Sequence, residues 1–475
     1  MDDLHRLLDD ALARVRLSDE STVGDDGPPA YSDEALALRF TERHGDDLRF
    51  VAQWGAWMVW DGQRWRRDET QTVLSLARAI AREASAEVAR DGTGRGRLAG
   101  AVASAKTVGA IERLARADRR HAAGVDDWDR DSWLLNTPGG TVDLRAGAVR
   151  PHGRGDLITK VTAVAPGGEC PLWQTFLQRV FRGDQEMIKF SRRMLGYSLT
   201  GSIDEHALFF LHGTGGNGKG VFLNTWRGIV GDYGVVAPME TFTAGGFDRH
   251  PTELAMLRGA RVVVAQETEA GQRWKESLIK QLTGGDAISA RFMRQDFISI
   301  QPTFKLLIAG NHRPSLTTVD EAIRRRFNLV PFDCQIPKDE RDLQLTEKLR
   351  AEWPGILAWA IEGCVEWQRR GLDQPAAVLD ATEGYLADED TVGRFIDERC
   401  ATDDPTAVEE TGRLFDAWGA WCAASGEAAG TQMRLIQRLK AHGLTHGKST
   451  ATRRSIFRGI RLLEGEPATA IGPVG

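Results

Sequence analysis

Four short apolar runs, separated by segments with a helical hydrophobic period, mark the middle of the chain. They are ALFFL at 207–211, RVVVA at 261–265, FKLLIA at 304–309 and FNLVPF at 327–332. A strand that is apolar at nearly every position is expected where helices cover both faces of a sheet, as they do in parallel sheets. The alternation of such strands with helices therefore predicts an α/β core over residues 205–335.

The segments on either side of this core have other patterns. Apolar positions alternate around Asp61-Gly62, a strong hairpin signal, and two alanine-rich stretches follow the period of helices, which predicts a small α+β domain. After the core, helical periodicity continues and ends in a strand pair around Gly447. The predicted divisions are a tail and linker at 1–30, the α+β domain at 31–165, a helical collar at 166–204, the core at 205–335, a helical extension at 336–387, a basic module at 388–465 and a tail at 466–475.

The composition is that of a globular protein of a reducing cytoplasm. The five cysteines are scattered and form no CxxC pair, so neither a disulfide framework nor a zinc site is expected. No apolar run approaches the roughly 20 residues that a membrane span needs. With 475 residues the chain is too long for one core. We therefore expect a cytoplasmic protein of several domains with no membrane partner.

Charge is distributed unevenly along the chain. The net charge is −6, yet the segment from Thr431 to Leu463 contains eight Lys and Arg and no Asp or Glu. Lys448, Arg453 and Arg454 flank the turn in this segment. This asymmetry predicts that one end of the molecule binds a polyanion. The alternative is that these basic residues form an ordinary solvent-exposed face.

A glycine-rich loop follows the first apolar run and matches the pattern G-x-x-x-x-G-K. Its glycines let backbone N–H groups point at phosphate oxygens, and the N-terminus of the following helix adds partial positive charge. Lys219 supplies a cation for the β and γ phosphates. Gly220 occupies the place where Ser or Thr normally binds Mg²⁺, and a water can replace that ligand because Mg²⁺ keeps several waters. The predicted nucleotide-binding residues are Gly213, Thr214, Gly215, Gly216, Asn217, Gly218, Lys219 and Gly220.

The ends of the next strands supply the other groups that an NTPase needs. The second apolar run ends at Glu267 and Glu269, and Glu267 is the first choice to hold Mg²⁺ or polarise water in the Walker B role. Asn311 follows the third run, where an amide can bond the attacking water or the γ-phosphate. Arg325 and Arg326 precede the fourth run, and either can reach the γ-phosphate of a neighbouring subunit as an arginine finger. A finger of this kind requires a ring.

These blocks in this order resemble superfamily 3 helicases of the phage, plasmid and poxvirus primase–helicase branch. The resemblance rests on GTGGNGKG, VVVAQETE, the block from Lys280 to Arg291, IAGNHRP and DEAIRRRFNLVPF, all within about 120 residues. Upstream, WDGQRW, LLNTPGGTVDL and CPLWQTFL are similar to the segment before the helicase in that branch. Downstream, the tail from Asp390 is similar to its C-terminal winged helix.

The resemblance implies a hexameric, AAA+-like ring that hydrolyses ATP with Mg²⁺ and threads single-stranded DNA in replication. It also implies a pore-lining hairpin between the Walker B strand and the sensor. In this chain that segment carries Arg291 and Arg294, which can neutralise DNA phosphates, with Lys280 as a third basic candidate. Many relatives carry a primase at the N-terminus. Here only about 165 residues precede the helicase segment, and their acidic pairs lie in loop-like sequence, so we expect that this chain lacks a primase and that any primase partner is a separate protein.

Two other functions fit the same motifs. The first is a ring ATPase that loads or remodels proteins on DNA without unwinding it. The second is a DNA-binding initiator whose ATP site is weak because of Gly220. Unwinding of forked DNA by the chain, and its dependence on Arg291 and Arg294, separates the helicase from the remodelling ATPase.

Overall fold

The computed structural model describes residues 27–92, 95–244, 252–266, 268, 271–291, 298–449 and 452–463. Within these residues the chain divides into two compact units, one of 27–130 with 152–159 and one of 131–151 with 160–463. The predicted tails fall outside the described residues except for 27–30. In the described part of the chain, no helix is both long and apolar enough to cross a membrane.

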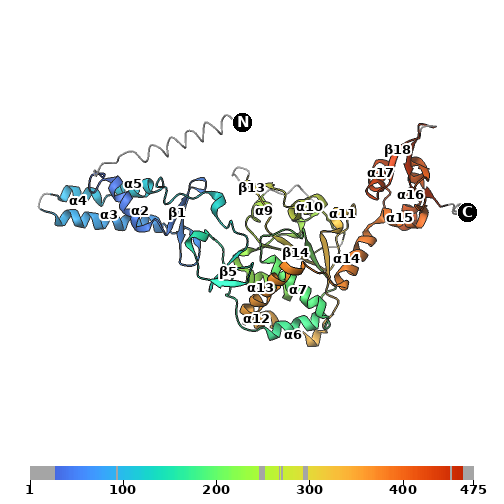
Figure 1. Cartoon of the computed structure of the whole chain (residues 1–475), viewed down its shortest axis with the longest axis horizontal. Coiled ribbons are helices and arrows are strands. Elements are labelled where there is room, and N and C mark those ends of the chain that lie inside the picture. Colours follow the sequence, from blue (N-terminus) through green and yellow to red (C-terminus); the bar gives the residue numbers. More distant parts are fainter. Residues whose placement is uncertain are drawn as a thin grey trace, which may run out of the picture. The chain divides into compact units, whose positions relative to one another are not determined.

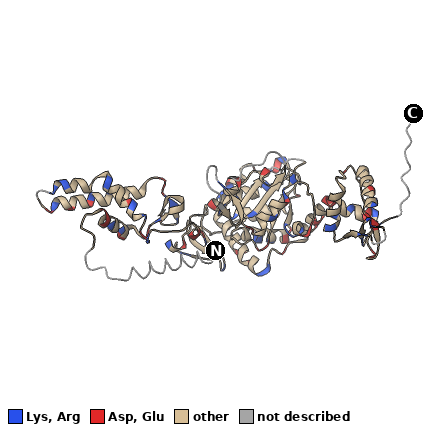
Figure 2. Ribbon diagram, turned by 90° about the horizontal axis from the view of Figure 1, so that it is seen from above, with Lys and Arg blue, Asp and Glu red and all other residues tan. Residues whose placement is uncertain are grey.

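The first unit is a small α+β domain, as its pattern predicts. Four helices pack beside an antiparallel sheet with the order β1-β2-β3. Basic and acidic side chains are interspersed over the helices (Figure 2). The elements are α2 (Asp33–His44), β1 (Leu48–Val51), β2 (Ala56–Trp60), β3 (Trp65–Arg67), α3 (Thr72–Arg90), α4 (Gly96–Val102) and α5 (Ala105–Ala115).

The hairpin predicted at Asp61-Gly62 joins β2 and β3. Gly62 has a φ of +98°, a left-handed conformation that glycine adopts without steric cost. The Asp61 carboxylate accepts hydrogen bonds from the backbone N–H groups of Gln63 and Arg64, both at 2.9 Å. Tryptophans of this region pack against one another: Trp65 is fully buried and makes an edge contact with Trp128. These aromatic side chains form a small core of the first unit.

The second unit is built on a parallel five-stranded sheet with helices on both faces (Figure 1). Its strand order is β15-β7-β14-β10-β8, and every neighbouring pair is parallel. The strands are β7 (Leu208–His212), β8 (Gly234–Val236), β10 (Val262–Gln266), β14 (Lys305–Gly310) and β15 (Phe327–Pro331). The α/β core predicted from the four apolar runs is confirmed.

Successive residues of β7, β10, β14 and β15 enter two different hydrophobic cores, which explains why these four strands are apolar at nearly every position. Phe209 and Leu211 of β7 pack with α6 (Pro171–Val180), α7 (Gln185–Ser198), α8 (Lys219–Val230) and α13 (Trp353–Arg370). Leu208 and Phe210 pack on the opposite face with α10 (Glu276–Gly284), α11 (Glu321–Arg324) and α14 (Ala376–Glu389). All four side chains are fully buried.

Residues 131–151 pack with the second unit, although the sequence pattern groups them with the first domain. They form the antiparallel sheet β4 (Leu134–Thr137), β5 (Gly140–Asp143) and β6 (Ala148–Arg150). Leu135, Val142 and Leu144 join the core that contains α7 and α13. The Arg261 guanidinium, at the start of β10, donates to Leu134 O at 2.6 Å.

Helix α14 connects the sheet with the basic C-terminal module. Its Thr382 Oγ1 accepts a hydrogen bond from Leu329 N of β15 at 2.9 Å. Its Tyr385 hydroxyl accepts from Trp274 Nε1 at 2.9 Å and donates to Pro314 O, just beyond the end of β14. The helix is therefore bonded both to an edge strand and to the loop after β14.

The C-terminal module has its own core. Leu414, Trp418 and Trp421 are buried with Leu439 and Phe457. The elements in chain order are α15 (Thr391–Arg399), β16 (Cys400–Ala401), β17 (Val408–Glu410), α16 (Thr411–Ser425), α17 (Gln432–Ala441), β18 (Thr445–Lys448), β19 (Ser455–Arg458) and β20 (Arg461–Leu462). Strands β17, β19 and β18 form an antiparallel sheet in that order, and β16 pairs with β20.

Smaller elements complete the second unit. The antiparallel pair β12 (Ile288–Ala290) and β13 (Ile298–Ile300) lies where the sequence predicts a hairpin. The remaining elements are β9 (Thr243–Ala244), α9 (Thr252–Ala255), β11 (Arg273–Trp274) and α12 (Leu345–Arg350).

Candidate functional site

The glycine-rich loop lies at the carboxyl end of β7, a central strand of the parallel sheet. Open α/β sheets bind ligands outside the carboxyl ends of their strands, and the loop leads directly into α8. Gly218, the N-cap of α8, has a φ of +91°, and a β-carbon there would stand 2.7 Å from Val180 Cγ1 of α6. Glycine is therefore required at this position both by backbone conformation and by the close approach of α6.

Lys219 lies inside this loop, nearly buried at 7% exposure. Its ammonium donates to Gly213 O at 2.6 Å, to Asn217 Oδ1 at 3.0 Å and to Asn311 Oδ1 at 3.1 Å. Burial lowers the pKa of Lys219 to about 8. The phosphate-loop lysine and the proposed sensor amide, which are 92 residues apart in sequence, are thus in direct contact.

The loop is also fixed to β15 on the other side of β7. Asn217 Nδ2 donates to Phe332 O at 2.7 Å, and Phe332 N donates to His212 O at the same distance. His212 itself is half-buried, and burial, followed by the charges of Arg313 and Lys219, lowers its pKa. His212 is a site residue that the sequence pattern did not indicate, because it appears there only as the end of an apolar run.

Thr268 links the segments that follow β10 and β14 by hydrogen bonds. Its hydroxyl donates to His312 O at 2.6 Å and accepts from His312 N at 3.2 Å. A β-carbon at Gly310 would stand 2.1 Å from the Thr268 hydroxyl, so only glycine fits there. Glu267 and Glu269, the predicted metal and catalytic acids on either side of Thr268, lie outside the described residues.

Gly220, one residue after the lysine, is exposed, and a β-carbon there would meet nothing within 4 Å. The fold therefore leaves room for the Ser or Thr side chain that is usual in phosphate loops. Thr214 and Gly215 are also exposed. Within the described part of the chain, no three His, Cys, Asp or Glu side chains gather as a metal centre. That is compatible with Mg²⁺, which is commonly held by one or two carboxylates together with substrate phosphates and waters.

The two finger candidates differ sharply in their surroundings. Arg326 is 6% exposed; its Nε donates to Thr283 Oγ1 at 3.0 Å and its Nη1 to Ala322 O at 2.7 Å. Burial lowers the pKa of Arg326. Arg325 is exposed, and its guanidinium makes no hydrogen bond or ion pair with the described residues. The geometry therefore favours Arg325 as the group able to reach outside its own chain.

The predicted pore residues fall into three cases. Lys280 forms an ion pair with Asp320 at 2.5 Å, and Asp320 also caps the start of α11. Arg291 is exposed at the end of β12. Arg294 lies outside the described residues. Lys280 therefore contributes to the packing of α10 against α11 in addition to its positive charge.

The basic residues of the C-terminal turn also differ from one another. Lys448 is exposed at the end of β18, and Arg453 is exposed with a left-handed φ of +56°. Arg454 makes a bidentate ion pair with Glu410 at 3.0 and 2.9 Å, which ties the turn to β17. Lys448 and Arg453 are therefore the more available of the three for a polyanion.

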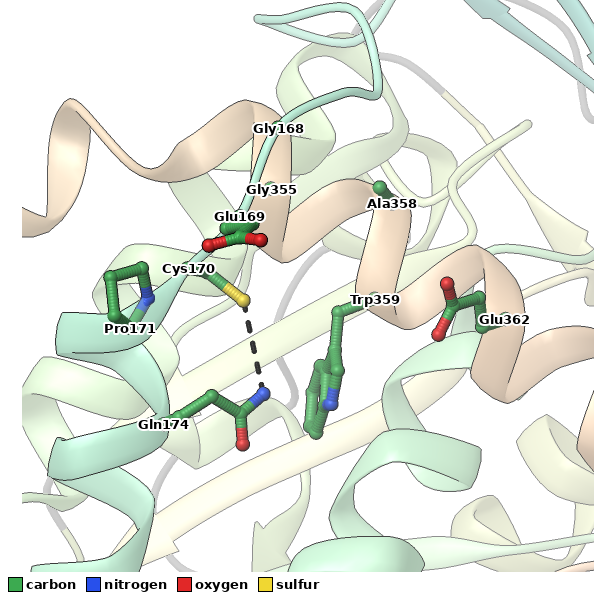
Figure 3. Close-up of a pocket in the computed structure, with 9 residues that line it drawn as sticks. All are labelled: Gly168, Glu169, Cys170, Pro171, Gln174, Gly355, Ala358, Trp359 and Glu362. Carbon is green, nitrogen blue, oxygen red and sulfur yellow. Dashed lines mark hydrogen bonds between the residues drawn. The ribbon is translucent and has the colours of Figure 1, made fainter.

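A separate cavity of ≈ 320 Å³ lies between the start of α6 and α13 (Figure 3). Glu169, Glu362 and the Trp359 ring line it together with the buried thiol of Cys170, and its lining contains no Lys or Arg. Burial raises the pKa of Cys170, so the thiol is not activated as a nucleophile. The nearby N–H groups of Leu172 and Trp173 already donate to Glu352. The cavity thus lacks the charge to bind a polyphosphate.

Comparisons with known families match two parts of the chain. Residues 37–182 match the family described as D5 N terminal like, and residues 211–326 match a family of unknown function, DUF5906. The second match covers the phosphate loop, β10, β14 and the three arginines.

Three viral proteins with related sequences carry the name putative helicase. L207/L206 of Acanthamoeba polyphaga mimivirus is 25% identical over 295 residues, which is 56% of this chain and 30% of that protein. Protein 022R of Frog virus 3 is 24% identical, with 56% of this chain and 29% of that protein covered. Protein 184R of Invertebrate iridescent virus 6 is 26% identical, with 47% and 24% covered. The matched region therefore spans less than a third of each relative.

Among solved structures, the C-terminal region of NrS-1 in its A form gives a TM-score of 0.49 at 10% identity. The match covers 89% of this chain and 98% of that one. A second apo structure of the NrS-1 C-terminal region gives 0.42 at 12% identity, with 63% and 78% covered. These scores are too low to establish a shared fold.

Proposed function

We propose that this chain is an ATP-dependent DNA helicase of the superfamily 3 type, which acts as a ring on single-stranded DNA in the replication of a phage, plasmid or other mobile element. The observation that carries the proposal is the contact between Lys219 Nζ and Asn311 Oδ1 at 3.1 Å. It brings together two groups that a P-loop ATPase uses on the same γ-phosphate. The names of the three viral relatives support the same class of activity.

Each group has a chemical task in this proposal. The loop N–H groups and Lys219 bind the β and γ phosphates, and Asn311 orients the attacking water or the γ-phosphate. Glu267, with Glu269 beside it, holds Mg²⁺ or polarises the water. Mg²⁺, when bound, supplies charge to neutralise the phosphate oxygens. Arg325 of one protomer completes the site of the next in a hexamer.

DNA contacts follow from the positions of the basic residues. Arg291 follows β12, Arg294 comes between β12 and β13 in the sequence, and both would bind the single strand within the ring. The C-terminal order of one helix, two short strands, two helices and three strands supports a winged helix, with Lys448 and Arg453 toward the DNA backbone. A separate primase is the expected partner.

The test measures ATP turnover with single-stranded DNA and unwinding of a forked duplex. Lys219→Ala should lower turnover about 100-fold or more, because a preorganised charge on the reacting phosphates is lost. Lys106→Ala, a change of an exposed lysine in the first unit, is the control and should keep both activities. Turnover in Lys219→Ala at the level of the control would refute the assignment. Turnover without unwinding, with no effect of Arg291→Ala, would favour the protein-remodelling ATPase instead.

A further inference from the structure

We infer that Arg341 is a second cation of the nucleotide site, which binds a phosphate oxygen of ATP or ADP from the same chain as the phosphate loop. This inference rests on the proposed function, and it adds a residue outside every motif used above. Arg341 lies ten residues beyond the end of β15, in a segment whose sequence gives no sign of a binding role.

The segment that carries Arg341 is held against the loop at three points. Phe332 N donates to His212 O, Asn217 Nδ2 donates to Phe332 O, and Ile336 N donates to Gly216 O at 2.9 Å. The turn that follows is tied to α6 by an ion pair between Glu340 and Arg179. These contacts fix the path of the chain toward the loop before any ligand binds.

The Arg341 side chain occupies the space beside Gly216. Its Nε donates to Ile336 O at 2.8 Å, which orients the guanidinium. A β-carbon built on Gly216 would stand 2.0 Å from Arg341 Nη2 and 2.5 Å from its Cζ. Gly216 has a φ of +79°, so both the conformation and the guanidinium exclude a side chain at this position of the loop.

Most of the hydrogen-bonding capacity of Arg341 is unused. Its Nη1 and Nη2 make no hydrogen bond or ion pair with the described residues, whereas a guanidinium has five N–H donors. The adjacent acids are engaged elsewhere, since Glu340 pairs with Arg179 and Asp342 pairs with Lys348 at 2.7 Å. A half-buried guanidinium with free donors at a phosphate loop is suited to phosphate, which it binds as a bidentate fork.

The competing role for Arg341 is mechanical support of the loop. If Arg341 only supported the loop, the size of its side chain and its hydrogen bond to Ile336 O would be needed, but its positive charge would not. Arg341→Gln keeps much of the length and an N–H donor and removes the charge. Arg341→Lys keeps the charge and loses the planar fork. The two variants therefore separate phosphate binding from support.

The experiment measures the Kd of Mg·ADP and of a non-hydrolysable ATP analogue by calorimetry, on the full chain. Arg341→Ala and Arg341→Gln should weaken one or both ligands about ten- to a hundredfold, the range for a charge-assisted hydrogen bond, and Arg341→Lys should recover part of the loss. A loss confined to the ATP analogue would assign the contact to the γ-phosphate, and a loss with both would assign it to the α or β phosphate. Lys338→Ala removes an exposed cation from the same turn and should bind as wild type.

Wild-type affinity in Arg341→Gln would overturn the inference, as would wild-type affinity in Arg341→Ala. If the chain has no nucleotide site, so that the proposed function itself is wrong, the result is different: the wild-type chain then binds neither ligand. If the wild type binds both ligands, Lys219→Ala does not, and Arg341→Gln is unaffected, the nucleotide site stands and only the role of Arg341 is refuted.

Discussion

At the scale of single residues, Lys219 shows how a phosphate loop provides hydrogen-bond acceptors for its own cation. Its three acceptors are oxygens of the loop and of Asn311. None of the three acceptors is a carboxylate. Burial is consequently not compensated by a negative charge, which is why the pKa falls.

This pKa predicts how nucleotide affinity depends on pH. Lys219 in the free protein loses its proton as the pH rises through about 8, whereas the bound triphosphate requires the charged form. The affinity for a non-hydrolysable ATP analogue should therefore decrease above about pH 8, by up to tenfold per pH unit, with uptake of a proton on binding. Calorimetry in buffers of different ionisation enthalpy measures that uptake. The same pH dependence in Lys219→Arg, whose side chain stays charged, would contradict the explanation.

The neighbouring arginines predict two distinct phenotypes. Arg325→Ala should lower turnover by about a thousandfold, as loss of a finger does, and leave stability within about 0.5 kcal/mol. Arg326→Ala should lower the free energy of unfolding by about 1–3 kcal/mol, because Thr283 and Ala322 O lose a buried partner. Denaturant unfolding and ATP turnover of the two variants separate the roles.

Mixing subunits tests whether the finger acts between chains. Arg325→Ala and Lys219→Ala protomers, each inactive alone, should regain partial turnover when combined, because some interfaces then contain both intact residues. Absence of any recovery in mixed rings would count against a finger that acts in trans.

At the scale of elements, the first turn of α8 carries an unusual residue. Gly220 is a helical position with open space around its Cα, so the fold does not require glycine there. A hydroxyl at this position normally reaches Mg²⁺.

Gly220→Ser should therefore lower the Mg²⁺ concentration needed for half-maximal turnover. It should also raise stability by about 0.5 kcal/mol, because glycine is less favourable than serine in a helix. Magnesium titration and denaturant unfolding measure the two effects, with Gly220→Ala as the control that adds helix propensity without an oxygen. Equal Mg²⁺ requirements in the serine and alanine variants would contradict a metal-binding role for this position.

Helices and strands were predicted from the sequence better than the individual site residues or the domain boundaries were. The four apolar runs became four parallel strands because their alternate residues enter two cores, and Asp61-Gly62 became a hairpin because its turn chemistry is local. The convergence of Lys219 and Asn311 followed from motif order. Arg341 and His212 were not predicted, since their position beside the loop depends on tertiary contacts with Gly216, Asn217 and Phe332. Residues 131–151 were grouped with the first domain because short strands give no signal of the core they join.

At the scale of the whole molecule, the stability of the first unit is expected to depend on pH through a buried histidine. His121 of the first unit is fully buried, with Nδ1 at 3.0 Å from Leu48 O and Nε2 at 3.2 Å from Thr41 Oγ1. A neutral ring satisfies both contacts, by donating to the carbonyl and accepting from the hydroxyl. Burial lowers the pKa of His121 in the folded state.

Because the unfolded chain then binds the proton more readily, stability contributed by His121 is present above about pH 6.5 and is lost as the pH falls toward the lower folded pKa. The free energy of unfolding of the first unit should decrease by about 1 kcal/mol per pH unit in that window. Thermal unfolding of the wild type and of His121→Gln at several pH values measures the effect. An unchanged pH slope in the variant would show that another group is responsible.

The basic C-terminal module predicts a salt-dependent contribution to DNA binding. Replacing both Lys448 and Arg453 by Ala should reduce the slope of log Kd against log salt concentration by about 2, because two phosphate contacts are lost. Arg454→Ala should change affinity through the position of the turn, since its charge is already paired with Glu410. A salt titration with duplex DNA measures the slope, and an unchanged slope in the double variant would place the DNA contacts elsewhere.

Helix α14 links the loop that contains Asn311 to the basic C-terminal module. Tyr385 is bonded to the backbone just after Asn311, and the same helix ends directly before the module that carries Lys448 and Arg453. If the proposed ATPase moves the Asn311 loop during turnover, Tyr385 and α14 would carry that movement to the basic module of the same subunit.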